Sequence, residues 1–186
     1  MADAAQDLPR ISVKEYLEIE RGSTIRHEFV DGIMYAMTGT TKRHDLISTD
    51  FMGALLNHLK PPCVVYSANV KVHVETTDQE AFYYPDVHVS CSDLDSDTLV
   101  TEMPVLVIEV ASDRTANYDR GTKFDTYRKL PSLQEYVIAQ QSTQKIEVFR
   151  KRTSWQAEYF GPADTFTLES VDLTMPVAHF YRRVKF

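Results

Sequence analysis

The sequence predicts an α/β fold of the α+β type, in which a mixed central sheet is flanked by helices. Three patterns predict it. Residues 104–110 are apolar at almost every position, which is typical of a short central strand covered on both faces. Residues 44–59 carry an apolar stripe at helical spacing, which Pro61-Pro62 stops. Residues 134–160 contain three short β-type runs, which we interpret as an antiparallel meander.

Local signals predict the other elements. Ser12 and Glu15 fit a capping box that opens a helix over residues 13–20. Asp31-Gly32 is a two-residue hairpin signal between two antiparallel strands within residues 26–37. The remaining expected elements are, in order, a strand over 63–74, a turn over 76–80, a strand over 82–91, an acidic polar loop over 92–101, a helix over 118–130 closed by Pro131, and a last helical turn over 176–181.

The composition indicates a globular chain. A length of 186 residues with 43% hydrophobic content supports a substantial core, most economically in one domain over residues 12–186 that follows a flexible lead-in over residues 1–11. The formal net charge of −7 counts against a broad basic surface for nucleic acid. Bound metal ions and a local basic rim can offset this charge near a nuclease site, so the composition does not exclude a nuclease.

The two cysteines and the N-terminus bear on location. Cys63 and Cys91 have no CxxC spacing, and the favoured interpretation is that both are reduced. The N-terminus has no apolar run of signal-peptide type, and no window approaches the length of a membrane span. We therefore predict a soluble cytoplasmic protein with no membrane partner.

Asp86 is the first candidate for chemistry. It follows Pro85 at the head of a strand-like run, on the opposite face from Val87 and Val89. Because proline cannot donate to a sheet ladder, Pro85 favours a bulge or a strand start at which the next side chain is exposed. The spacing fits an ordinary surface aspartate as well as a functional carboxylate.

Glu109 follows four apolar residues in the predicted central strand. An unpaired buried carboxylate costs roughly several kcal/mol, so Glu109 must reach water, pair with a cation or bind a metal ion. A structural ion pair is the alternative to a metal site. The turn-rich loop between Asp86 and Glu109 allows their two strands to pair side by side.

Lys123 lies on the predicted helix, with Asp119 and Tyr127 on the same face at four-residue spacing. One interpretation is an intrahelical pair with Asp119, worth only tenths of a kcal/mol. The other is functional: two carboxylates hold Mg²⁺ while the lysine ammonium steadies the charge that develops on a phosphate.

Two upstream residues are candidates for the same site. Glu28 precedes the hairpin turn, and His44 begins the first long helix. The free N–H groups at a helix N-terminus favour an anion, so Lys42, Arg43 and His44 are placed to meet a phosphate. A surface glutamate and an ordinary histidine at a helix start are the alternatives, and spacing alone leaves them open.

Together these segments resemble the Uma-two family of restriction-type endonucleases, a branch of the PD-(D/E)xK nuclease superfamily. The resemblance covers about residues 12–181 with order and spacing preserved, and it is most specific between residues 85 and 136. The matching pieces are His27-Glu28-Phe29-Val30-Asp31-Gly32, His44, Tyr84-Pro85-Asp86-Val87, Val107-Ile108-Glu109-Val110-Ala111-Ser112, Thr115, Asp119, Lys123, Tyr127 and Gln134-Glu135-Tyr136-Val137.

The resemblance implies a restriction-endonuclease-like core and a Mg²⁺ or Mn²⁺ ion held by Asp86, Glu109 and the carbonyl oxygen of Val110. The lysine of the superfamily usually lies two residues after the acid, where this chain has Ala111. In this branch the charge comes from the next helix, so the resemblance assigns the role to Lys123.

A second departure follows Ser112, where Asp113-Arg114 replaces the more typical Ser-Pro. This replacement is expected to reshape the loop at the site.

We therefore predict a metal-dependent endonuclease that hydrolyses phosphodiester bonds in DNA. Glu28 is a further metal ligand or water-orienting group in this hypothesis, and His44 is a phosphate contact or proton carrier. The main alternative is a nuclease-fold module without catalysis that binds nucleic acid or a protein partner; a hydrolase for another substrate ranks last. A homodimer is expected because a two-fold pair cuts both strands of a duplex most simply, with Trp155 and Tyr159 as interface candidates.

Overall fold

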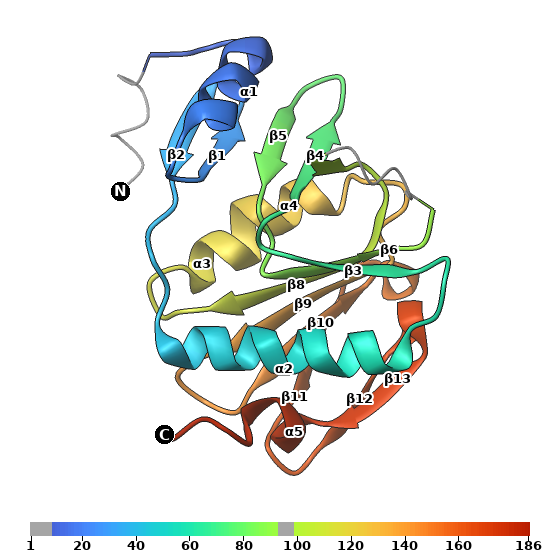
Figure 1. Cartoon of the computed structure of the whole chain (residues 1–186). Helices are drawn as coiled ribbons and strands as arrows, with labels where there is room; N and C mark the ends of the chain where they lie inside the picture. Colours follow the sequence, from blue (N-terminus) through green and yellow to red (C-terminus); the bar gives the residue numbers. More distant parts are fainter. Residues whose placement is uncertain (1–8, 93–98) are drawn as a thin grey trace.

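The structure is a computed structural model that describes residues 9–92 and 99–186. A six-stranded mixed sheet forms its centre, and a five-stranded sheet and a two-stranded hairpin accompany it (Figure 1). The predicted α+β class with helices flanking a mixed sheet is confirmed. The sequence did not indicate that the strands divide between separate sheets. The assignment of residues 12–186 to one domain stays a prediction.

The six-stranded sheet has the order β11-β10-β9-β8-β6-β3, with β8 and β9 parallel and the other neighbours antiparallel. The predicted central strand and meander are present in it. Its strands are β3 (Val64–Ser67), β6 (Val87–Ser90), β8 (Pro104–Ala111), β9 (Glu135–Gln140), β10 (Ile146–Arg150) and β11 (Ala157–Phe160).

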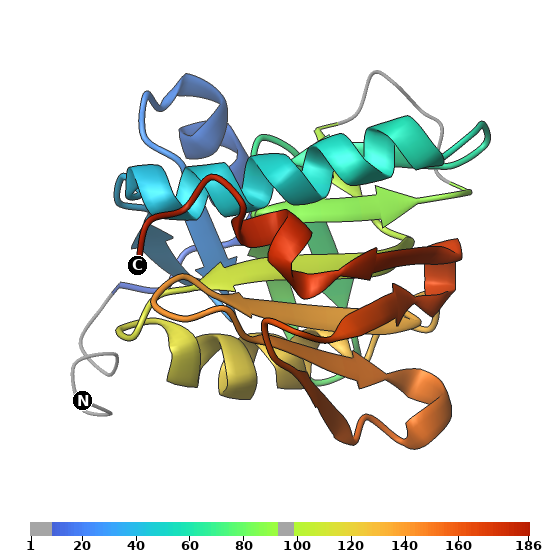
Figure 2. The ribbon, with the colours of Figure 1, turned by 90° about the horizontal axis from the view of Figure 1, so that it is seen from below.

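Helices cover both faces of this sheet, as Figure 2 shows. Helix α2 (Lys42–His58) lies on one face, and the segment α3–η1–α4 lies on the other; its parts are Ala116–Tyr118, Asp119–Lys123 and Phe124–Tyr127. Ile108 of β8 belongs to the core cluster of Phe51, whereas Val107 belongs to that of Phe124. Because side chains alternate along a strand, Glu109 points to the α3–α4 side.

The five-stranded sheet has the order β2-β1-β5-β4-β7. Asp31 and Gly32 adopt φ values of 48° and 91° at the predicted hairpin turn, which suits a type I′ turn. The predicted capping box opens α1, where Ser12 and Glu15 bond to each other's backbone. The elements are α1 (Val13–Gly22), β1 (His27–Val30), β2 (Ile33–Ala36), β4 (Lys71–Glu75), β5 (Glu80–Tyr83) and β7 (Val100–Thr101).

The strands predicted over 63–74 and 82–91 are each wrong as single elements. The first divides into β3 and β4 and the second into β5 and β6, and in both cases the two parts belong to different sheets. The second break falls at Pro85, which has no N–H to continue a ladder. Asp86 therefore lies where the chain passes from one sheet to the other.

Smaller differences concern the flanking segments. The predicted turn over 76–80 ends one residue early, because Glu80 begins β5. A hairpin of β12 (Thr165–Leu168) and β13 (Leu173–Pro176) was not predicted, whereas the last helical turn is α5 (Val177–Tyr181). In the predicted loop over 92–101, residues 93–98 lie outside the described residues, as do residues 1–8 of the lead-in.

The expectation of reduced cysteines is wrong in this structure, which joins Cys63 and Cys91 in a disulfide. Val64 and Ser90 are opposite each other in the antiparallel pair of β3 and β6, so the residues next to them are brought together. A separation of 28 residues gives no local signal of this pairing. In the described part of the chain, no helix has the length and apolar character needed to cross a membrane. The cytoplasmic location stays a prediction.

The buried ring of His88 on β6 predicts how the stability of the protein depends on pH. Its ring is fully buried, stacks on Tyr66, and lies 3.0 Å from the hydroxyl of Thr101 through Nε2. Burial lowers its pKa from 6.5 to about 3. Below pH 6.5 the unfolded chain therefore binds a proton that the folded chain excludes, and stability falls by about 1.4 kcal/mol per pH unit. Denaturant titrations should show that the free energy of unfolding falls less between pH 7 and pH 4 in His88→Gln than in the wild type. The same pH dependence in both proteins would contradict this account.

Candidate active site

Asp86 is held at the end of β8. The paired residues of β6 end at Val87, opposite Ile108, so the N–H of Val110 extends beyond the partner strand. The Asp86 carboxylate accepts a hydrogen bond from this N–H through Oδ2 at 2.7 Å. A break in the strand at Pro85 thus places a carboxylate beside the carboxyl end of β8.

Glu109 and Glu28 share one lysine. The Lys123 Nζ lies 3.1 Å from Glu109 Oε1 and 2.8 Å from Glu28 Oε1. The side chains of all three are at most 10% exposed. The surface interpretation of Glu28 is therefore wrong, and the ion-pair alternative for Glu109 is part of what the structure contains. Within the described ranges, the ion pairs of Lys123 go to these two residues and not to Asp119.

Lys123 ends a π-helical turn, η1, inside the segment predicted as a regular helix. Such turns are rare and occur often at functional sites. Its Nζ also lies 5.5 Å from the centre of the Tyr83 ring. An ammonium has three donors, and the two carboxylates account for two of them. Within residues 9–92 and 99–186 the third donor has no ion-pair partner, so it can meet an incoming oxygen.

His44 reaches the same place from α2. Its backbone N–H donates to the capping hydroxyl of Thr41, and its Nε2 lies 3.1 Å from Asp86 Oδ2. Burial opposes a charge on the ring, but the hydrogen bond and the charge of Asp86 outweigh it and raise the pKa of His44. Its Nδ1 is buried without a partner among the described residues. The structure thus brings together all the side chains predicted for the site.

The electrostatics of the site are dominated by buried acids. Burial raises the pKa of Glu109; Lys123 opposes this rise, while Asp86, Asp119 and Glu28 add to it. Burial alone would lower the pKa of Lys123, but the charges of three of these acids outweigh it, so this pKa is raised. The acids of this group thus outnumber its one lysine, and this excess of negative charge favours a further cation.

The donor set fits a hard divalent cation, which prefers oxygen ligands. The contacts described above use Oδ2 of Asp86 and Oε1 of Glu109, so the other oxygen of each carboxylate can face an ion. The carbonyl of Val110 points to the same edge of β8 as its N–H, because both groups of an extended residue face one neighbouring strand. Asp119 also belongs to this acidic group, and burial raises its pKa. From the sequence we considered it only as the partner of Lys123 in an ion pair within the helix.

A second group of possible metal ligands lies on the hairpin of β4 and β5. The ligand atoms of His73, Glu75 and Glu80 all lie within 4.8 Å of one another. His73 and Glu80 are already in contact at 3.1 Å, and Glu75 is exposed. This group is separate from the predicted site residues and must be controlled for in metal titrations.

Comparison with known proteins identifies the family. Residues 13–178 match the family model described as "Uma2: Putative restriction endonuclease". The chain belongs to the Uma2 family. The recognition made from the sequence is thereby confirmed, and this description supports a nuclease function at the level of the family.

Two relatives and one solved structure are similar to this chain over most of its length. An "Uncharacterized protein slr1290" of Synechocystis is 33% identical over 182 residues, which cover 96% of this chain and 95% of the relative. An "Uncharacterized protein sll1609" of the same organism is 26% identical over 76% of this chain and 81% of its own length. A crystal structure from Anabaena variabilis, described as "a putative nuclease belonging to DUF820", has the same fold, with a TM-score of 0.77 at 15% identity over 92% of this chain and 98% of that chain.

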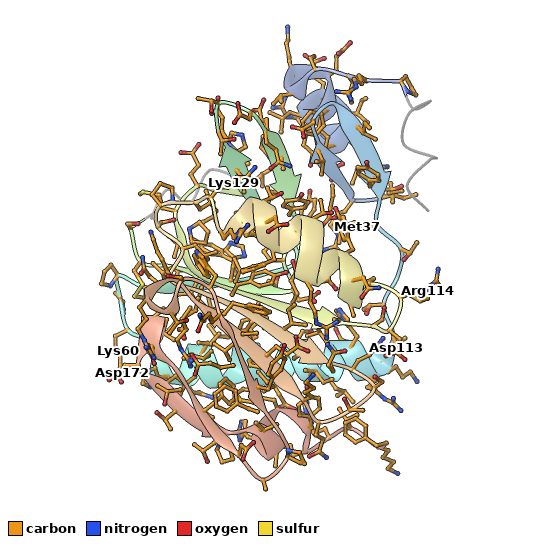
Figure 3. All side chains as sticks on the ribbon, turned by 180° about the vertical axis from the view of Figure 1, so that it is seen from behind. Met37, Lys60, Asp113, Arg114, Lys129 and Asp172 are labelled. Carbon is orange, nitrogen blue, oxygen red and sulfur yellow. A yellow bond between two sulfur atoms is a disulfide. The ribbon has the colours of Figure 1, made fainter. Side chains whose placement is uncertain are left out.

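Asp113-Arg114, the second departure from the Uma2 pattern, lies in the exposed loop between β8 and α3. Asp113 and Arg114 project from the loop between β8 and α3, on the same edge as Met37 (Figure 3). The loop is closed by mutual bonds between Ser112 and Thr115, and Asp113 accepts a hydrogen bond from Ser142 at 2.8 Å. The replaced residues are thus exposed and lie outside the buried cluster of acids.

Proposed function

We propose that this Uma2 protein is a Mg²⁺- or Mn²⁺-dependent endonuclease that hydrolyses phosphodiester bonds in DNA. The observation that carries the proposal is the position of the Lys123 ammonium between the carboxylates of Glu28 and Glu109. Asp86 lies next to them, because its carboxylate accepts a hydrogen bond from the N–H of Val110, the residue that follows Glu109 on β8. These side chains come from β1, β8, η1 and the junction before β6. A buried group of acids around one lysine has little use in a structural core, because it costs desolvation energy.

In this proposal Asp86 and Glu109 hold the cation through their carboxylates, and Val110 adds its carbonyl oxygen. The cation, when bound, lowers the pKa of a water molecule and polarises the phosphate. The protein's own contribution is to fix these oxygens in one buried place. The Val110 N–H orients Asp86, and the sheet orients Glu109.

Lys123, Glu28 and His44 act on the substrate side in this proposal. The Lys123 ammonium stabilises negative charge on the phosphate, while Glu28 keeps it protonated and directed into the site. His44 lies within the first turn of α2, where backbone N–H groups favour an anion. Its Nε2 faces Asp86, so Nδ1, which has no partner among the described residues, is the atom left to donate a hydrogen bond or a proton to a phosphate oxygen.

DNA as substrate and a homodimer complete the proposal. Trp155 is partly buried against the core cluster of Phe124, so it is a weaker interface candidate than the sequence suggested. Tyr159 is 61% exposed on β11, at the edge of the six-stranded sheet, and it remains a candidate. The alternative of a non-catalytic binding module retains one favourable observation, the net charge of −7.

Isothermal titration with Mn²⁺ separates these two functions. The nuclease proposal expects a Mn²⁺ site that is weakened at least about 100-fold in Asp86→Ala, since the loss of one charged ligand removes several kcal/mol. His73→Ala is the matched control, because it removes a ligand from the hairpin group and should leave the site intact. Binding that is lost in His73→Ala and kept in Asp86→Ala would contradict the proposal and favour the module.

A further inference from the structure

Tyr127 carries a buried polar atom that the proposed chemistry does not yet use. The side chain is fully buried on α4, and its hydroxyl has no hydrogen-bond partner among the described residues. Its ring packs 5.2 Å from that of Tyr83 and 5.7 Å from that of Tyr136. A phenylalanine would make the same ring contacts, so packing does not explain the hydroxyl.

The neighbouring tyrosines differ in this respect. The hydroxyl of Tyr136 donates to the carbonyl of Asp119 at 2.9 Å, and the hydroxyl of Tyr83 donates to Thr126 at 3.4 Å. A buried hydroxyl without a partner costs about 1–3 kcal/mol of desolvation energy. Its presence at Tyr127 is therefore an unexplained cost to the fold.

The position of Tyr127 connects it with the buried acids. It follows Lys123 by four residues, which places both side chains on one face of the helical segment. It also contacts Tyr83, whose ring lies 5.5 Å from the Lys123 Nζ. After burial, the charges of Glu109 and Glu28 are the next causes that raise the pKa of Tyr127. Tyr127 therefore lies in the neighbourhood of Lys123 and its two carboxylates.

We propose that Tyr127 is a positioning residue of the cation site, whose hydroxyl donates a hydrogen bond to the Glu109 carboxylate when that carboxylate turns from Lys123 to a divalent cation. This inference rests on the proposed function. Glu109 now receives its hydrogen bond from Lys123 through Oε1. A carboxylate that ligates a metal needs another donor to fix its orientation, and loss of such a donor typically costs 10- to 100-fold in metal affinity.

The test is Mn²⁺ titration of the full chain and of Tyr127→Phe, together with denaturant unfolding in the absence of metal. We expect the Kd for Mn²⁺ to rise about 10- to 100-fold in the variant. We expect the unfolding midpoint to stay the same or to rise, since the change removes only an unpartnered hydroxyl. Tyr136→Phe is the matched control: it removes a hydroxyl that has a partner, so it should lower the midpoint and leave the Kd unchanged.

The outcomes are distinct. A wild-type chain that binds no Mn²⁺ overturns the proposed function and this inference with it. Wild-type binding that persists unchanged in Tyr127→Phe overturns the inference alone. A Tyr127→Phe protein that unfolds, or that loses stability as Tyr136→Phe does, assigns the hydroxyl a structural role and also overturns it.

Discussion

Replacing Glu109 by glutamine should abolish metal-dependent cleavage of DNA while leaving the fold intact. The change keeps the shape of the side chain and removes the charge that holds the cation. A metal ion supplies several kcal/mol of transition-state stabilisation, so we expect a loss of at least about 10³-fold in the cleavage rate. Lys123 keeps its 2.8 Å contact with Glu28, which limits the cost to stability. Plasmid cleavage with Mg²⁺ or Mn²⁺ measures the rate, and thermal unfolding monitors the fold.

The matched control for this experiment is Glu80→Gln. It removes one acid from the hairpin group of His73 and leaves the buried acids unchanged. We expect wild-type cleavage from it. Cleavage at the wild-type rate in Glu109→Gln, with loss in the control, would place the chemistry on the hairpin instead.

Replacing Lys123 by methionine should destabilise the protein strongly at neutral pH. Glu28 and Glu109 would then face each other without their shared cation, and removing one partner of a buried ion pair costs roughly 3–5 kcal/mol. Denaturant unfolding measures this loss. Lys129→Met is the control, because the side chain of that exposed lysine hydrogen-bonds to Gln79 at the surface and not to a buried acid (Figure 3). Its effect should be close to zero.

The pH dependence of Lys123→Met has a definite sign. Burial and the neighbouring acids raise the pKa of Glu109 above its usual 4.5, and loss of the lysine removes the group that opposes the rise. The folded variant therefore binds a proton that the unfolded chain has released. Its stability should increase as the pH falls toward 4.5 and decrease as the pH rises through the folded-state pKa. Added Mn²⁺ should also raise the unfolding midpoint. A variant as stable as the wild type at pH 7 would show that Lys123 is not the counterion of these acids.

Local sequence signals predicted much of the fold. The capping box at Ser12 and the Asp31-Gly32 turn act over a few residues, so their outcome does not depend on the rest of the chain. The apolar strand β8 was likewise visible, because burial on both faces leaves few polar positions. The alternation in residues 165–176 could have revealed the missed hairpin of β12 and β13.

Other features depend on distant partners. The alternation of residues 63–74 fits one strand or two, and only pairing with β6 or with β5 decides which sheet each part joins. The π-helical turn that ends at Lys123 has no sequence signature that reasoning from periodicity can read. The disulfide depends on strand register in the same way.

The residues of the candidate site were proposed from the sequence, and their role stays a prediction; how they are arranged in space could not be read from the sequence. Spacing left each of Asp86, Glu109 and Lys123 open to an ordinary structural interpretation, and the resemblance to the Uma2 family selected among these. That Glu28 shares the lysine with Glu109 could not be predicted, because β1 and β8 belong to different sheets. The partnerless hydroxyl of Tyr127 was equally hidden, since only packing reveals which buried groups lack a partner.

The most direct test of the cation site is a crystal structure of the protein soaked in Mn²⁺, with anomalous diffraction to locate the ion. The account predicts an anomalous peak bonded to one carboxylate oxygen of Asp86 and one of Glu109, with the Lys123 ammonium close by. A peak only at His73, Glu75 and Glu80, or no peak while the metal is in excess, would contradict it.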